Sequence, residues 1–119
     1  MKTFSTILIA LVAVVLIGTG LLMASISWMH RRSRNEISEL VSEFHPQMPF
    51  TAVTNRIGSP FRVFTNAQHI QEWGTTTDPT ILTNSVLHMF LHHAFPFRWI
   101  CVYTDTQKSQ VVYASWKDM

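Results

Sequence analysis

The chain has 119 residues and a formal net charge of +2 at pH 7, which leaves room for one small domain beside a targeting segment. Its 9 Lys and Arg residues nearly balance 7 Asp and Glu residues, so the composition excludes the strongly basic class of nucleic-acid-binding proteins. The single cysteine, Cys101, excludes an internal disulfide framework and a four-cysteine zinc site.

An uncharged, apolar segment follows the amino terminus. Residues 3–29 contain no Asp, Glu, Lys or Arg, and residues 7–17 read ILIALVAVVLI. As a helix, this segment is long enough to cross a hydrocarbon core of about 30 Å. We therefore predict a membrane anchor over residues 1–34, in contact with the lipid bilayer. The side chains expected at its membrane interface are Trp28, Arg31, Arg32 and Arg34.

A cleaved secretory signal is the alternative interpretation of this segment. Lys2 supplies a minimal positive region, and small residues such as Gly18 and Ser25 could border a cleavage site. The apolar run is long for a signal sequence, and an aromatic and basic flank follows it directly, so we favour a retained anchor. A lipid-modified precursor would need a cysteine at the end of the run, where the sequence has none.

Two short helices are predicted after the anchor. Ser33 and Glu36 fit a capping box at the start of the first helix. Apolar residues then recur at helical spacing over residues 37–44, and Pro46 ends the pattern. The alternative is that the anchor helix continues without a break through Arg34.

The second helix is predicted to begin at Pro49, because a proline in the first helical turn needs no N–H donor there. A glycine supplies the left-handed stop, and a proline two residues later prevents continuation. The residues of this structural motif are Val53, Ile57, Gly58 and Pro60.

Strands and a third helix are predicted in the remainder of the chain. The expected strands, rich in aromatic and β-branched residues, lie at residues 61–65, 69–73, 99–104 and 110–116. The third helix is predicted over residues 78–94, with Asp78 as its cap. The predicted fold class is α+β. Residues 35–119 are predicted to form a small domain of two short helices packed on an antiparallel β-sheet, with the third helix as an insertion.

Three motifs occur in order along this domain. The pattern V-x-x-x-I-G-x-P spans residues 53–60, V-Y-x-D spans residues 102–105, and V-V-x-x-S-W spans residues 111–116. In this order they resemble the SmpA/OmlA (BamE-like) family. The resemblance implies two helices on a three-stranded antiparallel sheet, and it implies kinship with small lipoproteins that brace the outer-membrane β-barrel assembly machinery.

The chain also departs from the family pattern. It reads Gln47-Met48-Pro49 where the family usually has Gly-Met-Thr before the second helix, and it lacks the lipid-bearing cysteine. The segment around residues 75–95 is an insertion relative to the family. The resemblance therefore predicts the fold, whereas the barrel-assembly role is not transferred to this chain.

The residues that could ligate a metal ion are His88, His92 and His93. On a helix, His88 and His92 would lie on one face, at the spacing used by H-E-x-x-H zinc peptidases. The general-base glutamate is absent between them, which excludes a peptidase of that class. A zinc, nickel or copper site would need a third ligand such as His45 or His69.

No catalytic residue and no cofactor are predicted. Cys101 lies between Ile100 and Val102 in a predicted strand, where a cysteine is expected to be a buried and inert core residue. The aromatic residues beyond the anchor lack the interleaved Lys and Arg of a nucleic-acid groove, so they are interpreted as core or partner-contact residues. We therefore predict that the protein is not an enzyme and has no nucleic-acid partner.

Two functions are consistent with these predictions. The first is a membrane-anchored, non-enzymatic protein-interaction module, a scaffold or accessory subunit at the cell envelope with an unidentified protein partner. The alternative is a small membrane-bound metal-binding protein that uses the three histidines. The arginines after the apolar segment outnumber Lys2 plus the amino terminus, which favours a cytoplasmic domain. The family resemblance favours the extracytoplasmic side.

Overall fold

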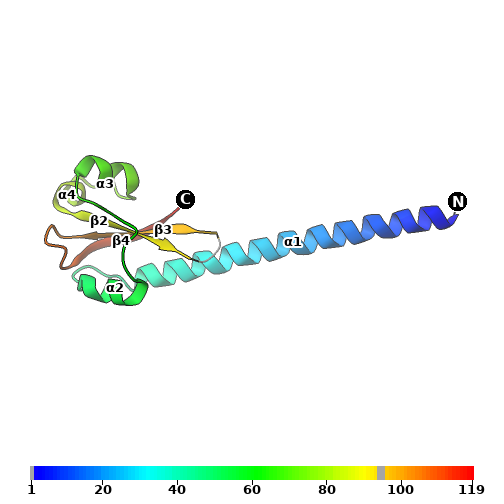
Figure 1. Cartoon of the computed structure of the whole chain (residues 1–119), viewed down its shortest axis with the longest axis horizontal. Helices are drawn as coiled ribbons and strands as arrows, with labels where there is room; N and C mark the ends of the chain where they lie inside the picture. Colours follow the sequence, from blue (N-terminus) through cyan, green and yellow to red (C-terminus); the bar gives the residue numbers. More distant parts are fainter. Residues whose placement is uncertain (1, 94–95) are drawn as a thin grey trace. The chain divides into compact units, whose positions relative to one another are not determined.

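The computed structural model describes residues 2–93 and 96–119. They form two compact units, of which the first ends at Arg32 and the second extends from Ser33 to Met119 (Figure 1). The described residues of the first unit are all helical. The second unit contains a β-sheet and the shorter helices that accompany it.

Helix α1 (Lys2–Ser42) provides the apolar segment of the first unit. Its length and composition suffice to cross a membrane, and that stretch is not buried against other parts of the protein. A signal sequence shares both properties. The hydroxyls of Thr6 and Thr19 donate hydrogen bonds to the carbonyls of Lys2 and Val15, at 2.9 and 2.8 Å. These polar groups therefore have acceptors inside the helix, as an apolar environment requires.

The predicted helix start at Ser33 is wrong. Residues 21–45 contain neither Gly nor Pro, so no helix-breaking residue separates the apolar helix from the short helix predicted over residues 37–44. Ser33 lies inside α1 and is buried, and its hydroxyl accepts a hydrogen bond from Arg98 Nη1 at 2.7 Å. The alternative, in which the first helix continues through Arg34, is confirmed.

The second unit is built around one four-stranded antiparallel sheet in the order β1-β2-β3-β4. Its strands are β1 (Arg62–Phe64), β2 (Val86–His92), β3 (Arg98–Thr104) and β4 (Val111–Asp118). The shorter helices are α2 (Phe50–Ile57), α3 (Ala67–Trp73) and α4 (Pro79–Asn84). The α+β fold class, with a long apolar N-terminal helix, is confirmed.

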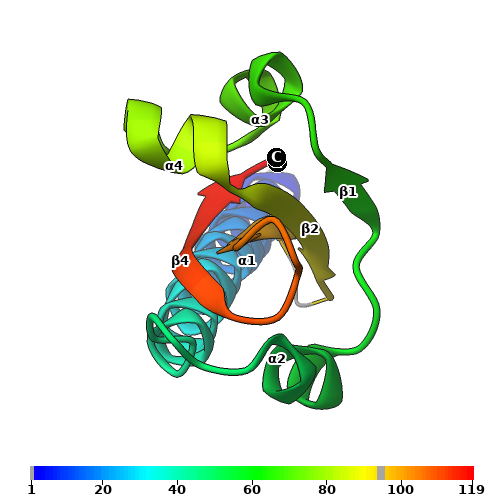
Figure 2. The same cartoon turned by 90° about the vertical axis from the view of Figure 1, so that its left-hand side faces the viewer.

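Each face of the sheet has its own hydrophobic cluster, and Figure 2 shows α2 on one side and α3 and α4 on the other. On the first face, residues of α1 and α2 join the sheet in a cluster whose buried members are Ile37, Phe44, Val53, Phe90, Ile100, Val102 and Val111. On the second face, residues of α3 and α4 join it in a cluster of Ile70, Leu82, Leu87, Met89, Cys101 and Tyr103. Side chains along β3 alternate between the clusters, as its sequence predicted.

The first face also buries an arginine. Arg98 is 2% exposed, and its Nε donates to Asp118 Oδ1 at 2.8 Å while its Nη1 donates to Ser33. The guanidinium lies 5.4 Å from the centroid of the Trp116 ring. Hydrogen bonds and the aromatic ring thus compensate the lost hydration of this charge. The arginine links the end of α1 to the last strand.

Two predicted elements are wrong. Residues 69–73 were expected to form a strand, but they belong to α3, which begins after Asn66 because the Asn66 side chain accepts a hydrogen bond from the Gln68 amide at 2.8 Å. The helix predicted over residues 78–94 is limited to α4 and is followed by β2. Because β2 is a central strand, both of its faces are covered. Residues 86–91 therefore do not alternate between apolar and polar side chains. Ala94 lies outside the described residues.

The remaining predicted elements are confirmed with small changes of boundary. Helix α2 ends where the motif predicted, since Gly58 has φ 87° and donates its amide to Thr54 O at 2.8 Å. Val53 is buried in the first cluster, and Ile57 packs against it. Asp78 caps α4 by accepting from the Thr80 amide at 3.0 Å. Strands β1, β3 and β4 lie within or overlap the predicted segments.

Candidate functional site

The three histidines considered as metal ligands do not lie on a helix. His88 and His92 belong to β2, where residues four apart are about 13 Å apart along the strand. His88 is buried, His92 is half-buried, and His93 is exposed just beyond the strand. Within residues 2–93 and 96–119, no group of three His, Cys, Asp or Glu side chains could hold a metal ion. The helical spacing behind the metal-site hypothesis is therefore wrong.

His88 is instead a buried polar group of the first face. Its Nε2 lies 2.9 Å from Thr104 Oγ1, and its ring centroid lies 4.2 Å from that of Phe50. The Thr104 hydroxyl donates to Asp105 O, so Nε2 carries the hydrogen and donates to Oγ1. Burial lowers the pKa of His88 to about 4, with a smaller effect from the positive charge of Lys108. The imidazole is neutral at pH 7.

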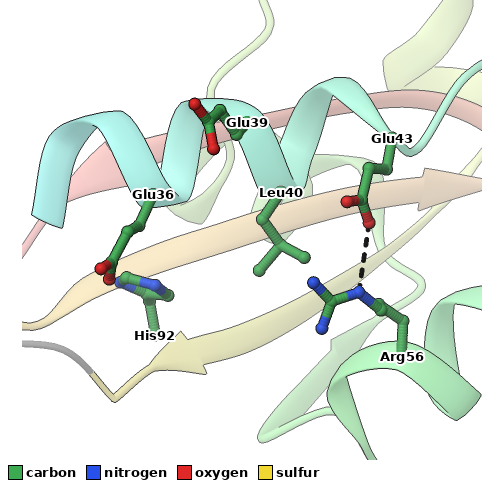
Figure 3. Close-up of a pocket in the computed structure, with 6 residues that line it drawn as sticks. All are labelled: Glu36, Glu39, Leu40, Glu43, Arg56 and His92. Carbon is green, nitrogen blue, oxygen red and sulfur yellow. Dashed lines mark hydrogen bonds and ion pairs between the residues drawn. The ribbon is translucent and has the colours of Figure 1, made fainter.

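A surface groove with a volume of about 320 Å³ lies between α1, α2 and β2 (Figure 3). We call it the acidic groove; it is lined by Glu36, Glu39, Leu40, Glu43, Arg56 and His92. Glu36 and Glu39 belong to α1, Glu43 directly follows this helix, and the guanidinium comes from α2. Glu43 Oε2 lies 3.2 Å from Arg56 Nε, but both side chains are more than half exposed, so the ion pair contributes less than about 1 kcal/mol.

His92 is the titratable base of the acidic groove. Figure 3 shows the Glu36 carboxylate turned toward its ring. Burial lowers the pKa of His92, and the negative charge of Glu36 partly opposes this effect. With His92 neutral, the three glutamates and Arg56 give the groove a formal charge of −2. The groove offers charge but no activated nucleophile.

A smaller cavity of about 140 Å³ lies beside the edge strand β1. We call it the aromatic pocket; it is lined by Phe61, Arg62, Trp73, Met89 and Trp99. Met89 is buried, whereas Phe61 and Trp73 are 62% and 38% exposed. Exposed aromatic rings grouped around a cavity are typical of a binding surface, because isolated monomers normally withdraw such groups from water.

The pairing of β1 with β2 and the position of α3 assemble the aromatic pocket. The register of β1 and β2 sets Arg62 opposite Met89. Helix α3 follows β1 closely and brings Trp73 back to that strand, where its ring stacks on Phe64 with centroids 5.9 Å apart. The rings of Phe61 and Trp99 lie 5.5 Å apart. These contacts fix the rings in place before any ligand arrives.

Arg62 is the charged residue of the aromatic pocket. Its Cζ lies 5.9 Å from the centroid of the Trp73 ring, a cation–π distance. Among the described residues, the guanidinium makes no ion pair and no hydrogen bond. Its N–H donors are therefore left to solvent or to a ligand.

Cys101 and the membrane-interface residues occupy other parts of the chain. Cys101 is buried in the second cluster, as predicted, and burial raises the pKa of its thiol to about 11. The thiolate that nucleophilic chemistry requires is not formed near pH 7. Trp28, Arg31, Arg32 and Arg34 are exposed on α1, and Arg32 Cζ lies 5.3 Å from the centroid of the Trp28 ring.

Comparison with known proteins gives no relative: no family model, no curated protein and no solved structure matches the chain. The site must therefore be interpreted from its geometry. Sequence reasoning missed the aromatic pocket because it placed Trp73 in a strand and Met89 in a helix. The signal that could have found it is Asn66, whose side chain predicts a helix start directly after the first strand.

Proposed function

We propose that the chain is a membrane-anchored, non-enzymatic protein-interaction module, a scaffold or accessory subunit at the cell envelope. The observation that carries the proposal is the aromatic pocket with its exposed Phe61 and Trp73 rings. Trp and Arg are the residue types that dominate the energetics of protein interfaces, and aromatic residues are enriched there. The apolar part of α1 would hold the module at the bilayer.

The chemistry of the buried titratable groups supports a binding role over catalysis. His88 and Cys101 are both held in their neutral forms, with the pKa of the imidazole lowered and that of the thiol raised. Neither residue lines the acidic groove or the aromatic pocket. A substrate in either cavity would therefore contact neither of these two groups.

A BamE-like fold is part of this proposal. The motif of residues 53–60 covers the end of α2 and the exit toward β1, V-Y-x-D covers the end of β3, and V-V-x-x-S-W lies within β4. In this arrangement the end of α1 and α2 act as the two helices of the family and pack on the first face. The placement of the three motifs within strands and at element boundaries supports the proposal.

We place the domain on the cytoplasmic side in this proposal. Support comes from Arg31, Arg32 and Arg34, which follow the apolar stretch, against Lys2 before it. The test is labelling of Lys108→Cys, on the exposed turn before β4, with a membrane-impermeant thiol reagent in intact cells. We expect labelling only after the membrane is opened. Labelling of intact cells would place the domain outside the cytoplasm.

Photo-crosslinking tests the interaction module directly. Phe61→benzoylphenylalanine puts a photoreactive group at the aromatic pocket, and Phe97→benzoylphenylalanine is the matched control at an exposed ring that does not line it. In native membranes we expect a discrete protein adduct from position 61 only, and we expect it to persist with His92→Gln. Equal adducts from both positions, or lipid adducts alone, would contradict the proposal.

A further inference from the structure

We propose that the aromatic pocket binds an extended segment of a partner protein in which an apolar residue and an acidic residue lie two positions apart. This inference rests on the proposed function and names the chemistry of the partner at the same site. It depends on three properties of the pocket, namely its volume, its unpaired charge and its position beside an open strand edge.

The volume of the pocket fits one side chain. A cavity of about 150 Å³ in a protein core accepts a benzene ring, and the aromatic pocket has about 140 Å³. Its walls are the rings of Phe61, Trp73 and Trp99 and the buried thioether of Met89. A leucine or phenylalanine side chain would bury its surface against these groups. A strongly hydrated cation would lose water there without gaining hydrogen bonds, and it would meet the positive charge of Arg62.

The charge at the pocket specifies a second residue of the bound segment. Arg62 is exposed and lies against the Trp73 ring, and among the described residues it has no anionic partner. A guanidinium presents its N–H donors in its own plane, where a carboxylate can accept two of them. In an extended segment, side chains two positions apart lie on the same face, so we expect the residue two positions from the apolar one to be acidic.

The open edge of the sheet indicates that the bound segment of the partner is extended. β1 pairs with β2 on one side only, and among the described residues no strand pairs with its other side. Backbone groups on an open edge accept an added strand, whose alternate side chains then enter pockets on one face. Arg62 lies in β1 and Phe61 directly precedes it, so a segment along this edge passes the pocket.

Selection of displayed peptides on the full-length chain in lipid nanodiscs tests the inference. The probe is a phage library of random seven-residue peptides, with empty nanodiscs for counter-selection. We expect enrichment of peptides that carry Leu or Phe two positions from Asp or Glu. Enrichment without an acidic residue at that spacing, enrichment of basic peptides, or no enrichment would overturn the inference.

A double-mutant cycle then tests the role of Arg62. Replacing the acidic residue of one selected peptide by its amide should weaken binding about tenfold, and Arg62→Gln should weaken binding of the original peptide equally. The two changes together should cost no more than either alone. Arg56→Gln, an exposed arginine in the acidic groove, is the matched control and should leave binding unchanged. Additive losses would overturn the inference.

Other occupants of the pocket give distinct results. Displacement of every selected peptide by sodium decanoate, with direct decanoate binding that Arg62→Gln weakens, would assign the pocket to a lipid. Self-association of the chain that Phe61→Ser abolishes would assign it to a second copy. Either result overturns the inference. A protein adduct at position 61 combined with no acidic preference would leave the proposed function intact, whereas loss of both would contradict both proposals.

Discussion

The two faces of the sheet bury similar apolar clusters but treat polar groups differently. The first face encloses polar side chains that are each hydrogen-bonded, namely Ser33, His88, Arg98 and Thr104. On the second face, the Tyr103 hydroxyl accepts bonds from the amides of Thr75 and Thr76, Cys101 contributes a buried thiol, and the buried Ser85 hydroxyl donates to the carbonyl of Ile81 beside the cluster. Directional bonds thus fix the first face, whereas aromatic contacts dominate the second and extend outward to form the aromatic pocket.

Removing the buried arginine should break the first face most severely. Arg98→Ala leaves a cavity and strands the buried Ser33 hydroxyl, so we expect the free energy of unfolding to fall by about 3 kcal/mol. Urea unfolding of the full chain in detergent, followed by tryptophan fluorescence, measures the change. Arg56→Ala, at an exposed ion pair, should cost less than about 1 kcal/mol. Equal costs would contradict the role assigned to Arg98.

Protonation of His88 at acidic pH should lower the free energy of unfolding. Its pKa is about 4 in the folded chain and about 6.5 in the unfolded chain, so between these values only the unfolded chain binds the proton. The free energy of unfolding should therefore fall by about 2 kcal/mol as pH decreases from about 6.5 to 4. His88→Leu should remove most of this slope and leave the smaller contribution of His92, whose pKa is also lowered. An unchanged slope would exclude His88 as its cause.

On the second face, one hydroxyl holds the connection between α3 and α4. Tyr103→Phe removes the acceptor of the Thr75 amide at 2.7 Å and the Thr76 amide at 3.3 Å. We expect a loss of about 1 kcal/mol in the free energy of unfolding and faster amide hydrogen exchange at these two positions. Tyr113→Phe, at a partly exposed ring, is the control and should change neither quantity.

The smallest expected effect is that of added metal. Titration of the full chain with zinc or copper should give no saturable heat at micromolar metal, because β2 separates His88 from His92 and buries the first of them. Saturable binding that His92→Gln abolishes would restore the metal-binding hypothesis and give the first face a ligand-binding role.

The sequence correctly predicted the elements that carry a recognisable local pattern, such as a helix-terminating glycine or alternating strand residues. Gly58 ends α2 by its own backbone conformation, and the alternating residues of β3 assign Cys101 and Ile100 to opposite faces. The capping box at Ser33 led to a wrong prediction because the Ser33 hydroxyl instead accepts a hydrogen bond from a distant residue, Arg98, which no local pattern reveals.

The strand β2 and the aromatic pocket could not be predicted in the same way. A central strand is apolar on both sides, so residues 86–91 fit a buried helix as well as a strand. The pocket needs the register of β1 against β2 and the return of α3, which come from tertiary packing. Arg62 and Met89 are far apart in the sequence, and nothing near either residue indicates the other.

The shortness of β1 has a consequence for solubility. Long open edges let the sheets of neighbouring molecules join and aggregate, whereas β1 has only three residues. At the opposite edge, the start of β4 is already covered, since Val111 exchanges backbone hydrogen bonds with Gln47 and Met48. A brief stretch of foreign chain can align with β1, but a fibril cannot grow from so short a template.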